Sequence, residues 1–309
     1  MERMFEVTTF YKFVGLTDLE VLRERLENAG RQLGLCGTIL LADEGINATV
    51  AAEGGNLDVF MEKLRAILEF SGIAEKRSTS GKPPFYRFKV RIKKEIVTLG
   101  AGVLDPAHNA GQYVAAKNWN ALIAEEGVVV IDTRNRYETA IGKFRGAIDP
   151  ETDTFGEFPQ WVKTHLDPEK TPKVAMYCTG GIRCEKATAL LKREGFSEVY
   201  HLEGGILKYL ETVSEQESLW EGDCFVFDGR VGLAHGLSEG NHVFCAGCRY
   251  PLAPEDLQHP EYEEGVACGR CSADAEETTK AGRRERQRQI RLAAARGEPH
   301  LGRIFRPVV

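Results

Sequence analysis

Apolar positions in the first hundred residues follow two different periods. Short runs with strand-like patterning recur four times, at residues 5–14, 36–41, 46–52 and 86–92. Apolar side chains at helical spacing predict a helix after Asp18, which we expect to cap it, and a second helix at 57–68 with Leu68 on its buried face. The order βαββαβ is the split βαβ pattern, so we expect an α+β ferredoxin-like domain over residues 1–100.

A different pattern starts at residue 111. Three continuous apolar runs, at residues 128–132, 174–177 and 198–202, are typical of strands that are buried on both faces. Helical stretches lie between them, and this alternation predicts an α/β domain with a parallel sheet over residues 111–221. Residues 222–309 contain cysteine pairs, Pro and Gly and then a charged stretch, which indicates a small Cys-rich region with a basic helix.

Composition limits the class of protein. The chain has 309 residues, of which 42% are hydrophobic and 28% charged, so it can form cores for two or three globular domains. No apolar stretch approaches the roughly 18 residues that cross a bilayer, and Glu2, Arg3 and Glu6 stand where a signal peptide would be apolar. We therefore expect a cytoplasmic protein without a membrane partner. Its eight cysteines should be reduced there, so their spacing indicates metal binding or catalysis before disulfides.

Charge is distributed unevenly along the chain. The net charge is −6, but residues 280–309 carry nine Lys or Arg and only two Glu. A second basic segment, residues 76–94, has eight Lys or Arg and no acid, and aromatic residues are interleaved with them. Aromatic side chains stack on unpaired bases, so RNA is the favoured polyanion, although a solvated surface explains either segment alone. We predict RNA contacts from two sets of side chains, the strand cations (Arg87, Lys89 and Arg91) and the helix arginines (Arg284, Arg288 and Arg291).

The strongest chemical signal lies between a predicted buried strand and a helix, in the loop Cys178, Thr179, Gly180, Gly181, Ile182 and Arg183. Its glycines can adopt positive φ so that backbone N–H groups converge, and the helix N-terminus adds about half a positive charge. Together with the guanidinium of Arg183, this should lower the pKa of Cys178 and favour the nucleophilic thiolate. We predict that Cys178 and Arg183 are catalytic and that residues 179–182 form an anion pocket; the alternative is a buried cysteine beside a turn.

Other residues near this loop have open roles. Asp132 follows a predicted strand and is a candidate support for the site, but an Asp that caps a turn is more common there. Cys184 is a candidate resolving thiol, although its helical face favours core packing. We expect Cys36 and Cys224 to be buried apolar side chains.

Two CxxC pairs stand in the third region. Cys245 and Cys248 form the first pair, Cys268 and Cys271 form the second, and 19 residues separate them. This spacing is typical of structural zinc sites in which thiolates occupy all four positions. We predict a zinc ion that replaces a hydrophobic core here. The alternative is four thiols without metal.

Residues 111–221 resemble the rhodanese domain. The similarity is carried by the segment 130–134, the six-residue loop from Cys178 to Arg183, and the segment 200–205. The resemblance implies that Cys178 carries a persulfide as the reaction intermediate. A related phosphatase class has one residue more between Cys and Arg, a loop sized for phosphate, so a phosphatase is disfavoured.

Nearly the full length resembles the bacterial oxygen-dependent tRNA uridine(34) hydroxylases, which convert the wobble uridine to 5-hydroxyuridine. The matching segments are residues 38–50, 93–100, 178–187, 203–207 and 224–231. One departure is Ala48, which stands where the family usually has glycine.

This resemblance implies a tRNA modification enzyme of the monooxygenase type, with O2 as co-substrate, the tRNA anticodon loop as partner and Cys178 in the active site. The residues themselves identify no redox cofactor, because the chain has neither a dinucleotide fingerprint nor a facial triad of two His and a carboxylate. Two alternatives stay open: a sulfurtransferase that uses a Cys178 persulfide, and a non-enzymatic RNA-binding adaptor.

Overall fold

A computed structural model describes residues 4–171 and 173–298. They belong to two compact units. The first runs to Val226 and includes Gly232–Gly240, and the second contains Phe227–Val231 and the residues from Asn241 onward. The end of the predicted basic tail, residues 299–309, lies outside the described residues. In the described part of the chain, no helix is both long and apolar enough to span a bilayer.

The N-terminal domain contains a five-stranded sheet in the order β4-β1-β3-β2-β5. Neighbouring strands are antiparallel except β5, which runs parallel to β2. The strands are β1 (Phe5–Phe13), β2 (Cys36–Ala42), β3 (Gly45–Glu53), β4 (Glu75–Ser80) and β5 (Phe88–Ile92). The predicted α+β ferredoxin-like domain is therefore confirmed.

The fourth strand of the split βαβ motif is β4, and the prediction that this strand lies at 86–92 was wrong. β4 pairs with β1 at one edge of the sheet, and its sequence, Glu-Lys-Arg-Ser-Thr-Ser, has no apolar alternation to reveal it. The apolar segment instead forms β5, an additional strand at the opposite edge. The basic segment 76–94 is consequently divided between the two edges of the sheet and does not form one patch.

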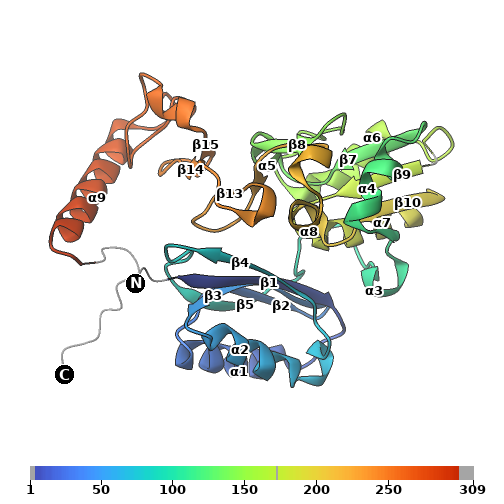
Figure 1. Ribbon diagram of the computed structural model, residues 1–309, viewed down its shortest axis with the longest axis horizontal. Coiled ribbons are helices and arrows are strands. Elements are labelled where there is room, and N and C mark those ends of the chain that lie inside the picture. Colours follow the sequence, from blue (N-terminus) through green and yellow to red (C-terminus); the bar gives the residue numbers. More distant parts are fainter. Residues whose placement is uncertain (1–3, 172, 299–309) are drawn as a thin grey trace. The chain divides into compact units, whose positions relative to one another are not determined.

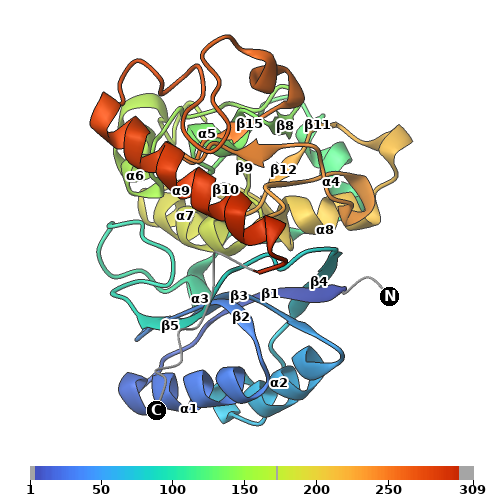
Figure 2. The ribbon, with the colours of Figure 1, turned by 90° about the vertical axis from the view of Figure 1, so that its left-hand side faces the viewer.

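Two helices, α1 (Leu19–Gln32) and α2 (Asn56–Arg65), cover one face of this sheet (Figures 1 and 2). The core between the layers includes Phe10, Ile39, Val50, Phe60 and Leu64. Two local predictions were wrong. Asp18 has a left-handed backbone and makes no side-chain cap. Leu68 is 85% exposed, because α2 ends at Arg65 and Leu68 starts a separate 3-10 turn.

The second domain is built on a four-stranded parallel sheet in the order β6-β10-β9-β7; the apolar runs predicted the parallel sheet and three of its strands, but not β6. Its strands are β6 (Gln112–Val114), β7 (Val128–Asp132), β9 (Lys173–Tyr177) and β10 (Glu198–Leu202). One face is covered by α4 (Ala116–Ile123) and α8 (Gly205–Thr212), the other by α6 (Phe158–His165) and α7 (Ile182–Arg193). The carboxyl ends of the parallel strands meet at one edge, where ligands of such sheets bind.

Short elements that the sequence did not indicate complete this domain. They are α3 (Pro106–Asn109), α5 (Arg136–Thr139), β8 (Gly142–Phe144), β11 (Trp220–Gly222), β12 (Cys224–Phe225) and β13 (Gly232–Leu233). β11 pairs with β8 and β12 with β13, and Cys224, Val226 and Leu233 join the core of the domain. The packing therefore continues beyond residue 221, where composition placed the domain boundary.

Buried contacts join the two domains of the first unit. Phe13 and Ala42 of the N-terminal sheet pack with Ile182 at the start of α7. The ammonium of Lys186, also in α7 and 2% exposed, lies 2.8 Å from a carboxylate oxygen of Glu44 and 2.5 Å from one of Glu95. The helix that follows the Cys178 loop is thus held by the N-terminal domain.

The second unit has little apolar material. Its elements are β14 (Val243–Phe244), β15 (Pro251–Leu252), the 3-10 helix η5 (Pro254–Gln258) and α9 (Glu277–Ala295). Its buried cluster consists of Cys245, Leu252 and Cys268, with half-buried residues around them. So small a core is typical of a segment that needs a metal ion to fold.

Candidate active site around Cys178

Cys178 lies at the carboxyl end of β9, directly before α7. Its thiol is fully buried and accepts a hydrogen bond from the backbone N–H of Gly181, with 3.1 Å between N and Sγ. Gly181 has φ of +104°, and a Cβ there would lie 2.7 Å from the Tyr11 hydroxyl, so only glycine fits this turn. Gly180 has an ordinary φ, which corrects the prediction that both glycines use the left-handed region.

The surroundings of Cys178 favour the thiolate. Burial alone would raise its pKa, but hydrogen bonding from Cys184, the charge of Arg183 and the N–H groups of Cys184 and Gly181 outweigh burial and lower the pKa from 9.0 to about 5. The thiol is then ionised at neutral pH, the form that acts as a nucleophile.

Arg183 is engaged in a buried ion pair that the sequence did not indicate. Its two terminal nitrogens donate to the two carboxylate oxygens of Glu138 at 2.6 and 2.7 Å. Glu138 is fully buried and sits in a capping box at the start of α5, where its carboxylate also accepts from the Asn135 N–H. Burial opposes ionisation of Glu138, yet the pairing with Arg183 lowers its pKa, so both groups are charged.

The rest of the loop is held by close packing. The Thr179 hydroxyl lies 3.3 Å from both Glu138 and Arg183. At Gly205 a Cβ would lie 2.5 Å from the Cys178 carbonyl oxygen, and the backbone N–H of Ile206 donates to that oxygen at 2.9 Å. The segment 203–207 therefore packs directly against the backbone of the Cys178 loop.

Asp132, the candidate support for the site, is engaged in a buried ion pair. Its carboxylate accepts from Nε and Nη2 of Arg134 at 2.9 and 2.6 Å, and both side chains are fully buried. The guanidinium of Arg134 also lies over the ring of Trp220, 5.1 Å from its centroid. Both carboxylate oxygens of Asp132 therefore accept hydrogen bonds from Arg134.

Cys184 packs in the core, as its helical face predicted, and it also lies beside Cys178. It is fully buried in the core of α7, as expected, but its thiol also hydrogen-bonds to Cys178 and lies 3.6 Å from the Thr133 hydroxyl. Burial and the neighbouring Cys178 sulfur raise the pKa of Cys184 well above its ordinary value, so it is a neutral donor to the thiolate. Cys224 is buried, which raises its pKa to about 12, and Cys36 is only half-buried.

Two side chains of the N-terminal domain reach the loop, a contact that the sequence analysis missed. Tyr11 of β1 donates a hydrogen bond to Glu185 of α7, with 2.7 Å between the oxygens. Lys76 of β4 donates to the carbonyl oxygen of Gly180 at 2.9 Å. Strand alternation explains the direction of Tyr11: Phe10 points into the helix-covered core, so Tyr11 points to the opposite face.

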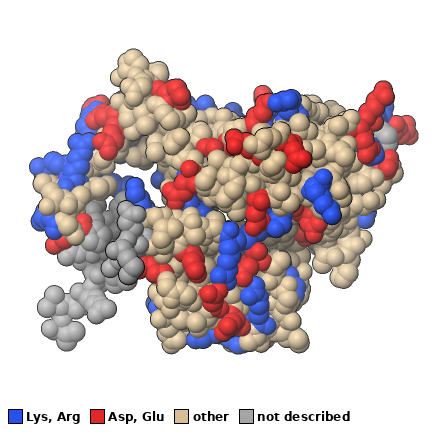
Figure 3. Space-filling view, viewed as in Figure 1, with Lys and Arg blue, Asp and Glu red and all other residues tan. Residues whose placement is uncertain are grey.

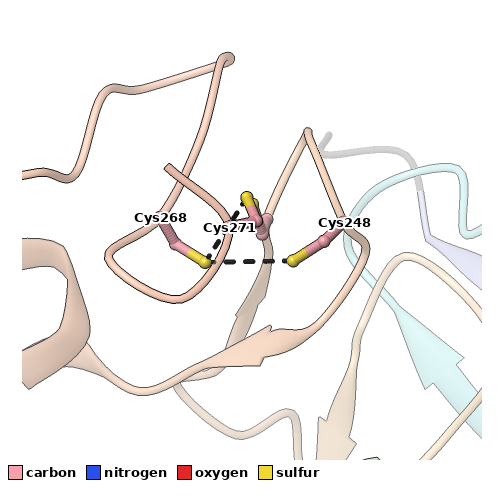
Figure 4. A group of neighbouring side chains, drawn as sticks. Cys248, Cys268 and Cys271 are labelled. Carbon is pink, nitrogen blue, oxygen red and sulfur yellow. Dashed lines mark hydrogen bonds between the residues drawn. The ribbon is translucent and has the colours of Figure 1, made fainter. Parts of the chain in front are cut away.

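The four cysteines of the second unit converge as a metal site would require. Their Sγ atoms all lie within 4.8 Å of one another, and three of the distances are 3.8, 3.9 and 3.9 Å. A zinc ion with four sulfurs at about 2.3 Å places those sulfurs about 3.8 Å apart, so the group fits zinc. In Figure 4, the sulfurs of Cys248, Cys268 and Cys271 point toward one another.

The helix arginines lie along α9 and are paired with acids. Arg284 contacts Glu263 and Glu277, and Arg291 lies 2.6 Å from Glu264. Figure 3 shows blue side chains along α9 with red ones among them. Solvent screens exposed pairs of this kind, so phosphates can compete for these arginines.

The strand cations lie on or beside β5 at the edge of the N-terminal sheet. Arg87 and Arg91 are exposed and Lys89 is half-buried. Other members of the basic segment are used internally: Lys76 contacts the Cys178 loop, and Arg77 pairs with Asp58 at 2.6 Å. Fewer side chains are therefore available for RNA in segment 76–94 than its eight Lys and Arg suggested.

The fold and the loop together define a protein with a rhodanese-like domain, whose Cys178 loop is contacted by Tyr11 and Lys76 of a ferredoxin-like domain. Residues 115–212 match the rhodanese-like domain family, and residues 5–96 match the UPF0176 acylphosphatase like domain. A rhodanese-like domain from Anabaena sp. is similar over 36% of this chain and 78% of that domain, at 20% identity and a TM-score of 0.29, which is too low to bear on function.

Relatives of similar length identify the family. A tRNA uridine(34) hydroxylase of Sinorhizobium fredii is 54% identical over 298 residues, which are 96% of this chain and 95% of that protein. The hydroxylase of Agrobacterium fabrum is 53% identical over 97% of this chain and 95% of its own length, and that of Teredinibacter turnerae 51% over 96% and 92%. This chain belongs to the tRNA uridine(34) hydroxylase family.

Proposed function

We propose that this chain hydroxylates C5 of uridine 34 in tRNA in an oxygen-dependent reaction, with Cys178 as its catalytic residue. By family, the chain is a tRNA-modifying hydroxylase, an enzyme of the oxidoreductase class. The observation that carries the role of Cys178 is its place in a six-residue anion loop, where its pKa of about 5 keeps the sulfur ionised at neutral pH.

The overall reaction replaces C5–H by C5–OH. One atom of O2 enters the base and the other leaves as water, so an external two-electron reductant must supply two electrons, together with two protons. Cys178 takes part as a thiolate or as its persulfide, the form that the rhodanese resemblance implies. We expect the base to approach over Gly180 and Ile182, which are the half-buried members of the loop.

The substrate portion we propose is the anticodon loop, because an unpaired base can leave its stack and expose C5. The strand cations and the helix arginines would contact phosphates, which position the RNA without reading its sequence. Zinc at the four cysteines would have a structural role only, since protein ligands fill all four positions. Because tRNA in bacteria is a cytoplasmic molecule, we place the reaction in the cytoplasm.

Mass spectrometry of tRNA nucleosides tests this function. A strain without the gene is complemented with the wild type, with Cys178→Ser, or with Cys36→Ser as a matched control at a half-buried cysteine of β2. We expect 5-hydroxyuridine to be lost with Cys178→Ser and to be retained with Cys36→Ser. Full modification with Cys178→Ser would refute the catalytic role. Loss of a thiolated nucleoside instead would indicate the sulfurtransferase, and no change in the deletion strain would indicate the adaptor.

A further inference from the structure

The positive charges of the rhodanese domain near Cys178 already have partners. Arg183 is held by both oxygens of Glu138, so this pair is neutral as a unit. Arg134 is paired in the same way with Asp132. A buried thiolate is costly to form, so a further positive charge beside the partly neutralised Arg183 would stabilise it.

Lys76 is a half-buried cation of a different kind. It makes no ion pair with a carboxylate among the described residues; its ammonium donates to the Gly180 carbonyl oxygen at 2.9 Å and lies 5.5 Å from the centroid of the Tyr11 ring. Burial lowers the pKa of Lys76, while the negative charges of Cys178 and Glu185 oppose that effect. The Lys76 ammonium therefore interacts electrostatically with the Cys178 sulfur.

Glu185 is a second acidic group that interacts with the positive charge of Lys76, and burial weakens its ionisation. The Glu185 carboxylate is 8% exposed and accepts hydrogen bonds from Tyr11 and Tyr113. Burial raises its pKa, and the Cys178 charge raises it further. Burial thus opposes ionisation of Glu185, the acid that shares the Lys76 charge with Cys178.

We infer that Lys76 is a positioning residue for the hydroxylation: its ammonium, which has no carboxylate ion-pair partner among the described residues, adds to the charge of Arg183 in holding the Cys178 sulfur as an anion, and its hydrogen bond fixes the Gly180 end of the loop. This inference rests on the proposed role of Cys178. It makes the N-terminal domain a part of the active site, in addition to any role in binding RNA.

The pH dependence of Cys178 alkylation tests the inference. The full-length protein is treated with iodoacetamide over a pH series, and the Cys178 peptide is quantified by mass spectrometry, because the chain has eight cysteines. The pH at which the alkylation rate is half of its maximum, the alkylation midpoint, reports ionisation of Cys178. Poor access to the buried thiol changes only the absolute rate. The charged or titratable groups that face Cys178 are Tyr11, Lys76, Glu138, Arg183, Cys184, Glu185 and Cys224.

Three substitutions separate charge from hydrogen bonding. Lys76→Met removes both, Lys76→Gln keeps a donor for the Gly180 carbonyl, and Lys76→Arg keeps the charge. We expect both neutral variants to raise the midpoint by about one pH unit, which leaves roughly tenfold less thiolate below the midpoint. Lys76→Arg should retain a low midpoint. Lys208→Met is the matched control, since Lys208 is an exposed lysine near Lys76 that is paired with Glu211 at 2.8 Å.

Two results would overturn the inference. One is a wild-type midpoint in Lys76→Gln with intact circular dichroism, which would leave only a hydrogen-bonding role. The other is an equal shift in Lys208→Met. The proposed function has its own test, because Cys178→Ser is assayed by tRNA modification, so the enzyme can depend on Cys178 whether or not Lys76 sets its charge.

Discussion

His201 should make the stability of the rhodanese domain depend on pH. Its side chain is 1% exposed in β10, neither ring nitrogen has a partner in the described residues, and its ring packs edge-on against Tyr113 with 4.2 Å between centroids. Burial lowers the pKa of His201 from 6.5 to about 4. Below pH 6.5 the unfolded chain therefore takes up a proton that the folded chain cannot accept, and folding stability falls as pH falls.

The expected size follows from that difference in pKa. Between pH 7 and pH 5, the free energy of unfolding should fall by about 2 kcal/mol through His201 alone, out of about 3 kcal/mol in total by pH 4. Urea titrations followed by tryptophan fluorescence report the correct domain, because the three tryptophans are Trp119, Trp161 and Trp220. His201→Phe should lack this component and be at least as stable at pH 7, since it removes two unpaired nitrogens. If the two proteins lose stability in parallel from pH 7 to pH 5, the reasoning is refuted.

Three further predictions concern the site and the second unit. Glu138→Gln should cost about 3–5 kcal/mol of stability in the same urea assay, because it removes the carboxylate that neutralises the buried Arg183, and it should lower the alkylation midpoint of Cys178; a cost below about 1 kcal/mol would contradict the buried pair. Protein prepared under reducing conditions without chelator should contain one zinc per chain by elemental analysis, and Cys268→Ser should contain less; a metal-free wild type would contradict the site. Alanine at all three helix arginines should weaken tRNA binding and flatten its salt dependence without changing which base is modified. If the slope of tRNA affinity against salt concentration is unchanged, these arginines do not contact the tRNA.

Periodicity predicted the parts of the fold that are buried. The strand at 128–132 was placed to the residue, because a strand buried on both faces is a nearly continuous apolar run. The strand at 198–202 was placed equally well, although its first residue, Glu198, is exposed. β4 was missed for the opposite reason, since an edge strand with polar side chains has no such pattern. The capping role of Asp18 failed because its own backbone is left-handed, a feature that residue type does not encode.

The loop could be predicted as a continuous motif, but its partners could not. Cys178 and its N–H donor Gly181 are near in sequence, whereas Glu138 lies 45 residues from Arg183 and Lys76 lies 104 residues from Gly180. Such contacts depend on the register of two separate sheets, and one residue of slip would turn Tyr11 to the other face. A clue to Glu138 existed in the capping-box spacing that begins at Asn135, three residues earlier.

The buried ammonium of Lys186 has a consequence for the order in which the chain folds. Its two carboxylate partners, Glu44 and Glu95, both belong to the segment that leaves the ribosome first. When α7 emerges later, its lysine can enter the interior only against a preformed N-terminal sheet, because an unpaired ammonium is costly to bury. Synthesis from the N-terminus thus delivers the neutralising acids before the charge that needs them. A circular permutant that is translated with the rhodanese domain first should accumulate a protease-sensitive intermediate until its acidic partners are made.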